Sequence, residues 1–201
     1  MDDGPIHRTA HEDLRYIRRT LDAAGRFSSL SGKGMVTVGV LALAAVVANL
    51  RFTGAPWDAG VRREFALGPW VVLLVASVVV GVWATARKAR RTGQVLWSPV
   101  LQKALWCSCA AMLLGGLLTA GVIRAGRLEL LPAIWLGCYG TALTAAGMMS
   151  VSPVRWMGVS FLALAGIAVF APPGFGLALL ALGFGWLHVA FGAYIAWRHD
   201  G

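Results

Sequence analysis

The sequence predicts an all-α integral membrane protein with six transmembrane helices, preceded by a cytoplasmic amphipathic helix. Three observations predict this fold class. Hydrophobic residues make up 58% of the 201 residues and charged residues only 13%, whereas soluble domains carry about 25% charged residues. Five long runs contain no charged residue. Lys and Arg are distributed unevenly between alternate segments of the chain, as the topology signals of membrane proteins are.

The uncharged runs set the positions of the spans, because a spanning helix needs about 20 mostly apolar residues. The last run is long enough for two spans, and Pro172-Pro173-Gly174 divides it because these residues cannot continue a helix. We therefore expect a cytoplasmic tail over residues 1–33 and a transmembrane domain over residues 34–201. The expected spans are about 34–51, 66–86, 102–123, 130–150, 154–171 and 175–197.

Local signals mark the ends of these spans. Ser98-Pro99 and Ser152-Pro153 each have the pattern of an N-cap followed by proline at the first helical position. Most tryptophans lie near expected span ends, as an interfacial aromatic belt requires: Trp57, Trp70, Trp83, Trp97, Trp135, Trp156 and Trp197. Trp106 and Trp186 lie deeper in their spans.

The positive charge predicts the orientation. Of the 18 Lys and Arg residues, 13 fall in segments on the same side as both termini, so both termini are expected in the cytoplasm. We interpret the net charge of +9 as a topology signal with attraction to anionic head groups, and expect no nucleic-acid partner because no binding motif accompanies it. The basic loop is expected to contact anionic lipid, with a phosphate or protein partner as the alternative: Arg87, Lys88, Arg90 and Arg91.

The segment "TAHEDLRYIRRTLDAAGRF" before the first span has the pattern of an amphipathic helix. Thr9 and Glu12 have capping-box spacing. At about 100° per residue, one narrow arc is apolar and the neighbouring arc is basic. Such a helix lies on the membrane surface or docks on a protein partner, and both alternatives stay open. The residues that would do so are Leu14, Ile17 and Leu21 on the apolar arc and Arg15, Arg18 and Arg19 on the basic one.

Two pairs of segments suggest an internal repeat. "VGVLALAAVVA" (38–48) matches "VSFLALAGIAV" (159–169) at five of eleven positions, and "GVWATAR" (81–87) resembles "GAYIAWR" (192–198). Together they indicate three repeated hairpins, with the middle pair more diverged. Ala, Leu and Val are common in all spans, so chance similarity is the alternative.

His188 is the candidate polar site of the domain, because it is the only histidine within an expected span. On a regular helix it shares a face with a seam of small residues that lets two backbones approach closely: Gly174, Ala181, Gly185 and Gly192. We expect His188 to face another helix and to bond Thr141, Thr144, Ser160 or Tyr139. The alternative is a role in binding a proton, ligand or substrate.

No cofactor and no metal ion is expected. Haem needs a second axial ligand opposite His188, for which only Met112, Met148 or Met149 is available. Cys107 and Cys109 would point to nearly opposite sides of one helix, which disfavours a shared soft-metal site with Cys138. Enzymatic activity is not expected either, since no carboxylate lies within a span and no catalytic motif is present.

Three segments carry a resemblance to a known group of proteins: "LRYIRRTLDAAGRFSSLSGKG", "ATARKARRTG" and "GFGWLHVAFGAYIAWR". They resemble small bacterial six-span membrane proteins of acidobacterial type. The resemblance implies the fold and the bacterial inner (cytoplasmic) membrane, and it implies no mechanism. The three-hairpin arrangement is also loosely similar to acid-resistance membrane proteins.

These observations predict a non-enzymatic multi-pass inner-membrane protein that senses or relays a signal or binds a protein partner. The alternative is a transporter or channel for a small neutral molecule, which the repeat and the Gly-rich spans favour. Haem binding is a third and less favoured hypothesis. Expected partners are the anionic bilayer, a protein at the N-terminal helix and a second copy of the chain, because small-residue seams join spans between subunits as well as within one.

Overall fold

The computed structural model describes residues 31–53, 67–92 and 97–199, and these residues form helices without any strand. The first five spans are α2 (Gly32–Thr53), α4 (Gly68–Thr92), α5 (Pro99–Ala125), α6 (Leu131–Gly147) and α7 (Ser152–Phe170). The sixth consists of α8 (Gly176–Leu180), a π-helical turn (Ala181–Leu187) and α9 (His188–His199). All six spans are long and apolar enough to cross a membrane, which confirms the predicted number. The predicted amphipathic helix lies outside the described residues.

The helix ends differ in how they are capped. Ser98 caps α5 as predicted, since its hydroxyl accepts a hydrogen bond from the Leu101 N–H at 3.2 Å. The prediction for Ser152 is wrong. Helix α7 already includes Ser152, and the extended residue before it, Val151, makes no side-chain cap. A 3-10 turn over Pro173–Phe175 separates the last two spans, at the predicted break.

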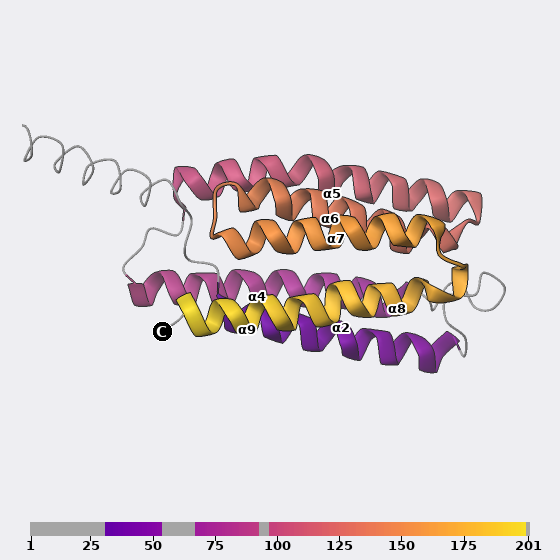
Figure 1. Cartoon of the computed structure of the whole chain (residues 1–201), viewed down its shortest axis with the longest axis horizontal. Coiled ribbons are helices and arrows are strands. Elements are labelled where there is room, and N and C mark those ends of the chain that lie inside the picture. Colours follow the sequence, from indigo (N-terminus) through magenta and orange to yellow (C-terminus); the bar gives the residue numbers. More distant parts are fainter. Residues whose placement is uncertain (1–30, 54–66, 93–96, 200–201) are drawn as a thin grey trace, which may run out of the picture.

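The spans form two groups of three helices that lie as two layers (Figure 1). One group contains α5, α6 and α7, in which α6 packs against both neighbours. The other contains α2, α4 and the sixth span, in which α2 packs against both neighbours. Spans 5 and 6 therefore follow each other in sequence but pack mainly on different partners. The predicted repeat of hairpins stays a prediction.

Glycines allow the closest helix contacts within each group. A Cβ added at Gly158 of α7 would lie 2.5 Å from the Thr144 backbone nitrogen of α6, and one at Gly140 would lie 2.9 Å from the Leu162 nitrogen. In the other group, a Cβ at Gly192 would lie 2.8 Å from the Val36 nitrogen of α2. Backbones that approach this closely gain dispersion contacts, which drive helix association in lipid.

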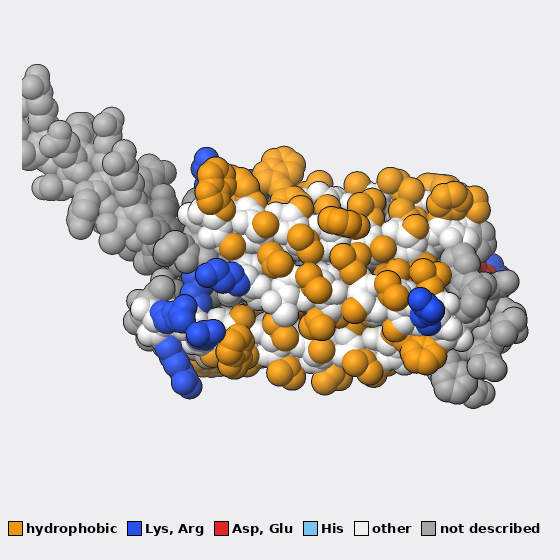
Figure 2. Space-filling model, turned by 90° about the horizontal axis from the view of Figure 1, so that it is seen from below, with side chains coloured by type: hydrophobic (Ala, Val, Ile, Leu, Met, Phe, Trp, Pro, Cys, Tyr) orange, Lys and Arg blue, Asp and Glu red, His pale blue; other side chains and the backbone are white. Residues whose placement is uncertain are grey.

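On the face seen in Figure 2, apolar side chains but no charged ones lie between the two ends. Helices α4 and α5 contribute exposed Val, Leu and Trp side chains along much of their length, as lipid-facing helices do.

Two tryptophans that we expected in the interfacial aromatic belt instead pack against each other. Trp70 is only 6% exposed and packs against Trp135, with ring centroids 5.5 Å apart. The position of a tryptophan along a span does not tell which face of the helix it occupies.

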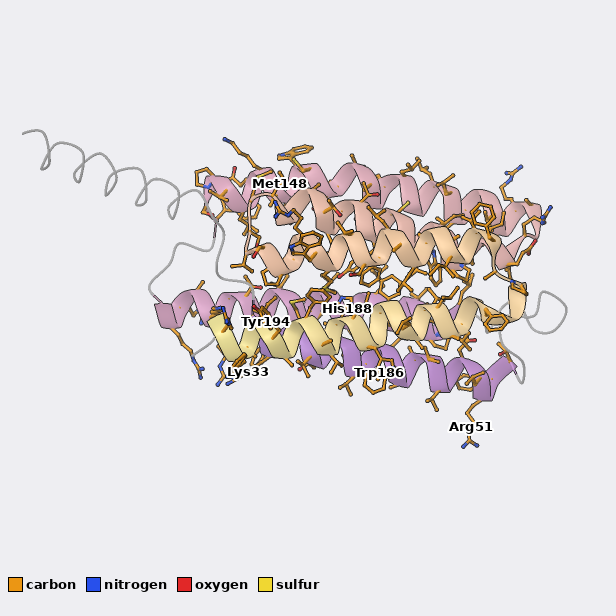
Figure 3. The ribbon with its side chains drawn as sticks, in the orientation of Figure 1. Lys33, Arg51, Met148, Trp186, His188 and Tyr194 are labelled. Atoms are coloured by element: carbon orange, nitrogen blue, oxygen red, sulfur yellow. The ribbon has the colours of Figure 1, made fainter. Side chains whose placement is uncertain are left out.

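Most of the described cations lie at one end of the molecule, and fewer lie at the other (Figure 2). This basic end carries Lys33 at the start of α2, the last two turns of α4, the start of α5 and the end of α9. Lys33 and Arg51 mark the opposite ends of α2 (Figure 3). At the end with Arg51, Arg127 forms an ion pair with Glu129, which lowers the net charge there.

Candidate functional site

The polar centre of the described bundle is a pair of side chains at the boundary between the two layers. Tyr139 of α6 and His188 at the start of α9 form a hydrogen bond, with 2.8 Å between the hydroxyl oxygen and Nε2. His188 is only 3% exposed and lies between the layers in Figure 3. Of the four partners expected for His188, Tyr139 is the one that the structure brings to it. The bond joins two spans of different groups.

The second ring nitrogen of His188 fixes the direction of that bond. Nδ1 lies 3.4 Å from the carbonyl oxygen of Gly183, and a carbonyl can only accept. Nδ1 is therefore protonated. Because His188 is buried among apolar rings, where a charged imidazolium would cost free energy, the ring is neutral and Nε2 is an acceptor. The Tyr139 hydroxyl donates to it. Both nitrogens thus have protein partners, so a haem or metal ion would have to displace one of them.

Aromatic rings enclose the pair on both sides. Phe161 of α7 lies edge-on to Tyr139 at 4.9 Å between centroids and edge-on to His188 at 5.6 Å. Phe184 of the π-helical turn stacks on His188 at 6.2 Å and packs against Tyr139 at 5.1 Å. We call these four residues the aromatic cluster. Its rings surround the hydrogen bond, which is part-buried, and the low polarity of these rings strengthens the bond electrostatically.

The π-helical turn positions the cluster. It includes Gly183, whose added Cβ would lie 3.1 Å from Cε1 of Phe161 and closer still to Leu136 of α6. A side chain here would displace those of Leu136 and Phe161, so the glycine lets the sixth span approach α6 and α7 closely. π-Helical turns inside α-helices are rare and are found frequently at functional sites.

The predicted small-residue seam is divided by this turn. Gly185 packs on Leu43 of α2 and Gly192 packs on the first turns of α2, so both serve the contact within one group. An added Cβ at Gly174 would meet nothing within 4 Å, so this residue does not extend the seam. Ala181 begins the π-helical turn. The turn departs from 100° per residue, which is why a regular helical projection placed His188 and these residues on one common face.

The other predicted site residues lie apart from the cluster. The basic loop residues occupy the end of α4, where the Arg87 guanidinium lies 5.2 Å from the centroid of the Trp83 ring. Arg198 lies in the same way over Tyr194 and Trp197. Cys107 and Cys109 are exposed on α5. The residues Leu14 to Leu21 of the predicted amphipathic helix lie outside the described residues.

Sequence reasoning missed three residues of interest. Phe161 and Phe184 complete the aromatic cluster, and the signal for Phe184 was its position between two glycines in "LGFGW". Asn49 is completely buried in α2, and the described residues contain only one other buried polar side chain, His188. An amide within the run "LALAAVVANL" was the signal for Asn49, since polar side chains within spans usually serve helix contacts.

No protein-family model, curated protein or solved structure matches the chain. The resemblance to small acidobacterial-type membrane proteins therefore stays a prediction, and the functional argument rests on the fold and on the geometry of the Tyr139–His188 site.

Proposed function

We propose that the protein is a non-enzymatic, multi-pass module of the bacterial inner membrane that relays a signal between its two groups of helices. Both termini lie in the cytoplasm, and the N-terminal amphipathic helix is the input, through contact with a protein partner or the membrane surface. The observation that carries the proposal is the Tyr139–His188 hydrogen bond, because it joins a span of one group to a span of the other.

The first step of the relay is the contact between α2 and the sixth span. Helix α2 begins directly after the N-terminal segment, so a displacement of that segment acts on α2 first. A Cβ added at Gly39 would lie 2.8 Å from the Gly185 carbonyl oxygen and 2.9 Å from the Val189 nitrogen. Backbones in such close contact cannot shift independently, since packed interfaces do not deform continuously.

The second step passes from the sixth span to α6. The π-helical turn has a helical geometry of low intrinsic stability, and a change to regular α-helix would rotate His188 relative to the residues before the turn. His188 would then lose Tyr139 or draw it along. Two alternative arrangements of one packed element are what a relay requires.

The packing between the groups favours a relay over a transport pathway. Large apolar side chains fill this region of the described bundle, including the fully buried Leu136, Phe161 and Leu180. A pathway for a neutral solute would need space between them. The transporter reading, and the repeat of hairpins on which it depends, therefore has less support here than the relay.

Hydrogen–deuterium exchange of the protein in nanodiscs tests the proposal. Tyr139→Phe removes the hydroxyl and keeps the ring. In a relay, this variant changes exchange beyond its own group of helices, in α2 and in residues 1–30. Thr119→Val is the matched control, because it removes a hydroxyl that accepts a hydrogen bond from Trp135 Nε1 at 2.9 Å within one group. The control is expected to change exchange in α5, α6 and the contact of Trp135 with Trp70, but not in α2 or in residues 1–30.

If Tyr139→Phe alters exchange only in α6, α7 and the sixth span, the hydrogen bond has a structural role and the relay is excluded. Equal distant effects of Tyr139→Phe and Thr119→Val would also contradict the proposal, because general loosening of the bundle would then explain both.

A further inference from the structure

A cavity opens on the lipid-facing side of the molecule between α5 and α6. It has a volume of about 400 Å³ and is lined by small and apolar side chains. Those that matter here are Cys107, Ala111 and Leu114 of α5 and Gly137, Cys138 and Thr141 of α6. Neither Tyr139 nor His188 lines this cavity, so it is separate from the Tyr139–His188 site.

The cavity exists because the two helices are held together while their facing side chains are small. The Ser108 hydroxyl donates to the Ala142 carbonyl at 3.2 Å, and Trp135 donates to Thr119 at 2.9 Å. Between these bonds, a Cβ added at Gly115 would lie 3.0 Å from the Cys138 Cβ. These contacts fix the spacing of the two helices. The side chains beside the contact are too small to fill the space between them, so a groove is left.

The lining calls for an apolar occupant. The Thr141 hydroxyl is already bonded to the Gly137 carbonyl at 2.9 Å, and thiols are weak hydrogen-bond donors. The groove lies in the uncharged part of both spans, and the helix surface beside it carries exposed apolar side chains such as Leu113 and Leu117. An acyl chain of a lipid fits this chemistry.

The basic end of the groove favours an anionic head group. At about 100° per residue, Lys103 falls on the same face of α5 as Cys107, Ala111 and Leu114, one turn nearer the basic end. Its side chain is exposed. Glu129 is the one acidic side chain in the ranges that the structure describes, and it lies at the opposite end of the bundle. Met148 marks the C-terminal end of α6 and lies at the same end of the molecule as the start of α5 (Figure 3).

We propose that this groove is a binding site for an anionic glycerophospholipid, with one acyl chain between α5 and α6 and the phosphate on Lys103. A second copy of the chain suits the groove less well. In a two-fold dimer formed through α5, both copies contribute the same residues to the contact. The two Lys103 side chains would then lie at the same end of the dimer, where their like charges repel each other.

Native mass spectrometry tests the site. The protein is released from detergent containing equal amounts of phosphatidylglycerol, which is anionic, and phosphatidylcholine, which is zwitterionic. We expect one retained phosphatidylglycerol per chain. Ala111→Phe fills the groove and should reduce retention at least fivefold. Ala120→Phe is the matched control, since it makes the same change on an exposed face of α5 away from the groove, and it should retain lipid as the wild type does.

Head-group recognition has its own variant. Lys103→Gln should bring retention of the two lipids to parity, whereas Arg124→Gln, at the other end of α5, should preserve the preference for phosphatidylglycerol. Equal retention by the Ala111→Phe and Ala120→Phe variants overturns the site. An unchanged preference in Lys103→Gln overturns the assigned head-group contact. Dimers that form without lipid and disappear in Ala111→Phe would assign the groove to a second copy instead.

The cysteines give an independent measurement. Cys107 lines the groove, whereas Cys109 is exposed on another face of the same helix. Phosphatidylglycerol should slow the reaction of a membrane-permeant maleimide with Cys107 at least threefold relative to Cys109. Equal protection of both thiols contradicts binding in the groove.

Discussion

At the scale of single residues, the structure explains how an imidazole is accommodated within an apolar run. A buried polar group costs free energy unless it is hydrogen-bonded, and His188 meets this condition through Tyr139 and the Gly183 carbonyl. An acyl chain of a lipid could replace neither partner, because it forms no hydrogen bonds. The histidine is thus tied to one arrangement of the sixth span against α6.

Substitutions of His188 should distinguish its hydrogen bond from its bulk. In His188→Gln the side-chain amide oxygen reaches the region of Nε2 and accepts from Tyr139, so this variant should be as stable as the wild type. His188→Leu loses the bond and changes the shape of the side chain within the aromatic cluster, which should cost about 1 kcal/mol or more. Thermal unfolding in detergent measures both. A leucine variant that melts with the wild type would show that the bond contributes no stability.

The sequence predicted the location of this site and named Tyr139 among the four possible partners of His188. An ionisable residue within an apolar span is visible in the sequence, and so is the short set of hydroxyl-bearing residues available to it. The choice of Tyr139 depends on the π-helical turn, which adds a residue to the turn before His188. Hydrophobic periodicity does not reveal such a turn, because the residues on both sides of it are apolar.

At the scale of helices, glycine positions decide which spans pack together. In α7, Gly158 lies against the α6 backbone, whereas a Cβ added at Gly166 would meet nothing within 4 Å. Composition alone does not separate these two glycines. The sequence therefore predicted the spans well but not the partners of each span, and the division into two groups was not foreseen.

The two glycines of α7 give a matched pair of variants. Gly158→Ala should destabilise the protein by about 1–3 kcal/mol, because the methyl group would overlap the Thr144 backbone and force α6 and α7 apart. Gly166→Ala adds the same group in open space and should be neutral. Chemical unfolding in detergent compares them. The packing described here would be incorrect if both variants unfolded at the same denaturant concentration.

The predicted N-terminal helix has its own prediction. Ile17→Asp together with Leu21→Asp places charges on the expected apolar arc. The helix should then dissociate from its protein partner or from the membrane surface. Co-purification of partners from membranes measures protein docking, with Ala23→Asp as a control that adds a charge outside both the apolar and the basic arc. Unchanged partner recovery with normal insertion would exclude docking through this face.

At the scale of the whole molecule, the proposed orientation depends on the uneven distribution of positive charge. The described cations concentrate at the end that carries the start of α2 and the end of α9, and the cytoplasmic side of bacterial membrane proteins is the basic one. This asymmetry was visible in the sequence because it depends only on the order of spans and loops. The arrangement of the spans in two layers was not visible in the sequence, because it depends on contacts between spans that are distant in the chain.

Reporter fusions test this orientation. Green fluorescent protein fused after residue 201 should fluoresce, because it folds in the cytoplasm, whereas alkaline phosphatase at the same position should be inactive. A fusion of alkaline phosphatase after Arg127 should be active. The reverse pattern at both positions would invert the orientation and place the N-terminal helix on the other side of the membrane.

The relay itself is tested most directly by the distance between the two groups of helices. Spin labels at Val47 of α2 and Leu117 of α5, both exposed, report this distance by double electron–electron resonance after the three native cysteines are replaced by alanine. The relay predicts that Ile17→Asp with Leu21→Asp shifts the distance distribution and that Tyr139→Phe abolishes the shift. The same distribution with and without the N-terminal substitutions, or an equal shift with and without the Tyr139 hydroxyl, would contradict it.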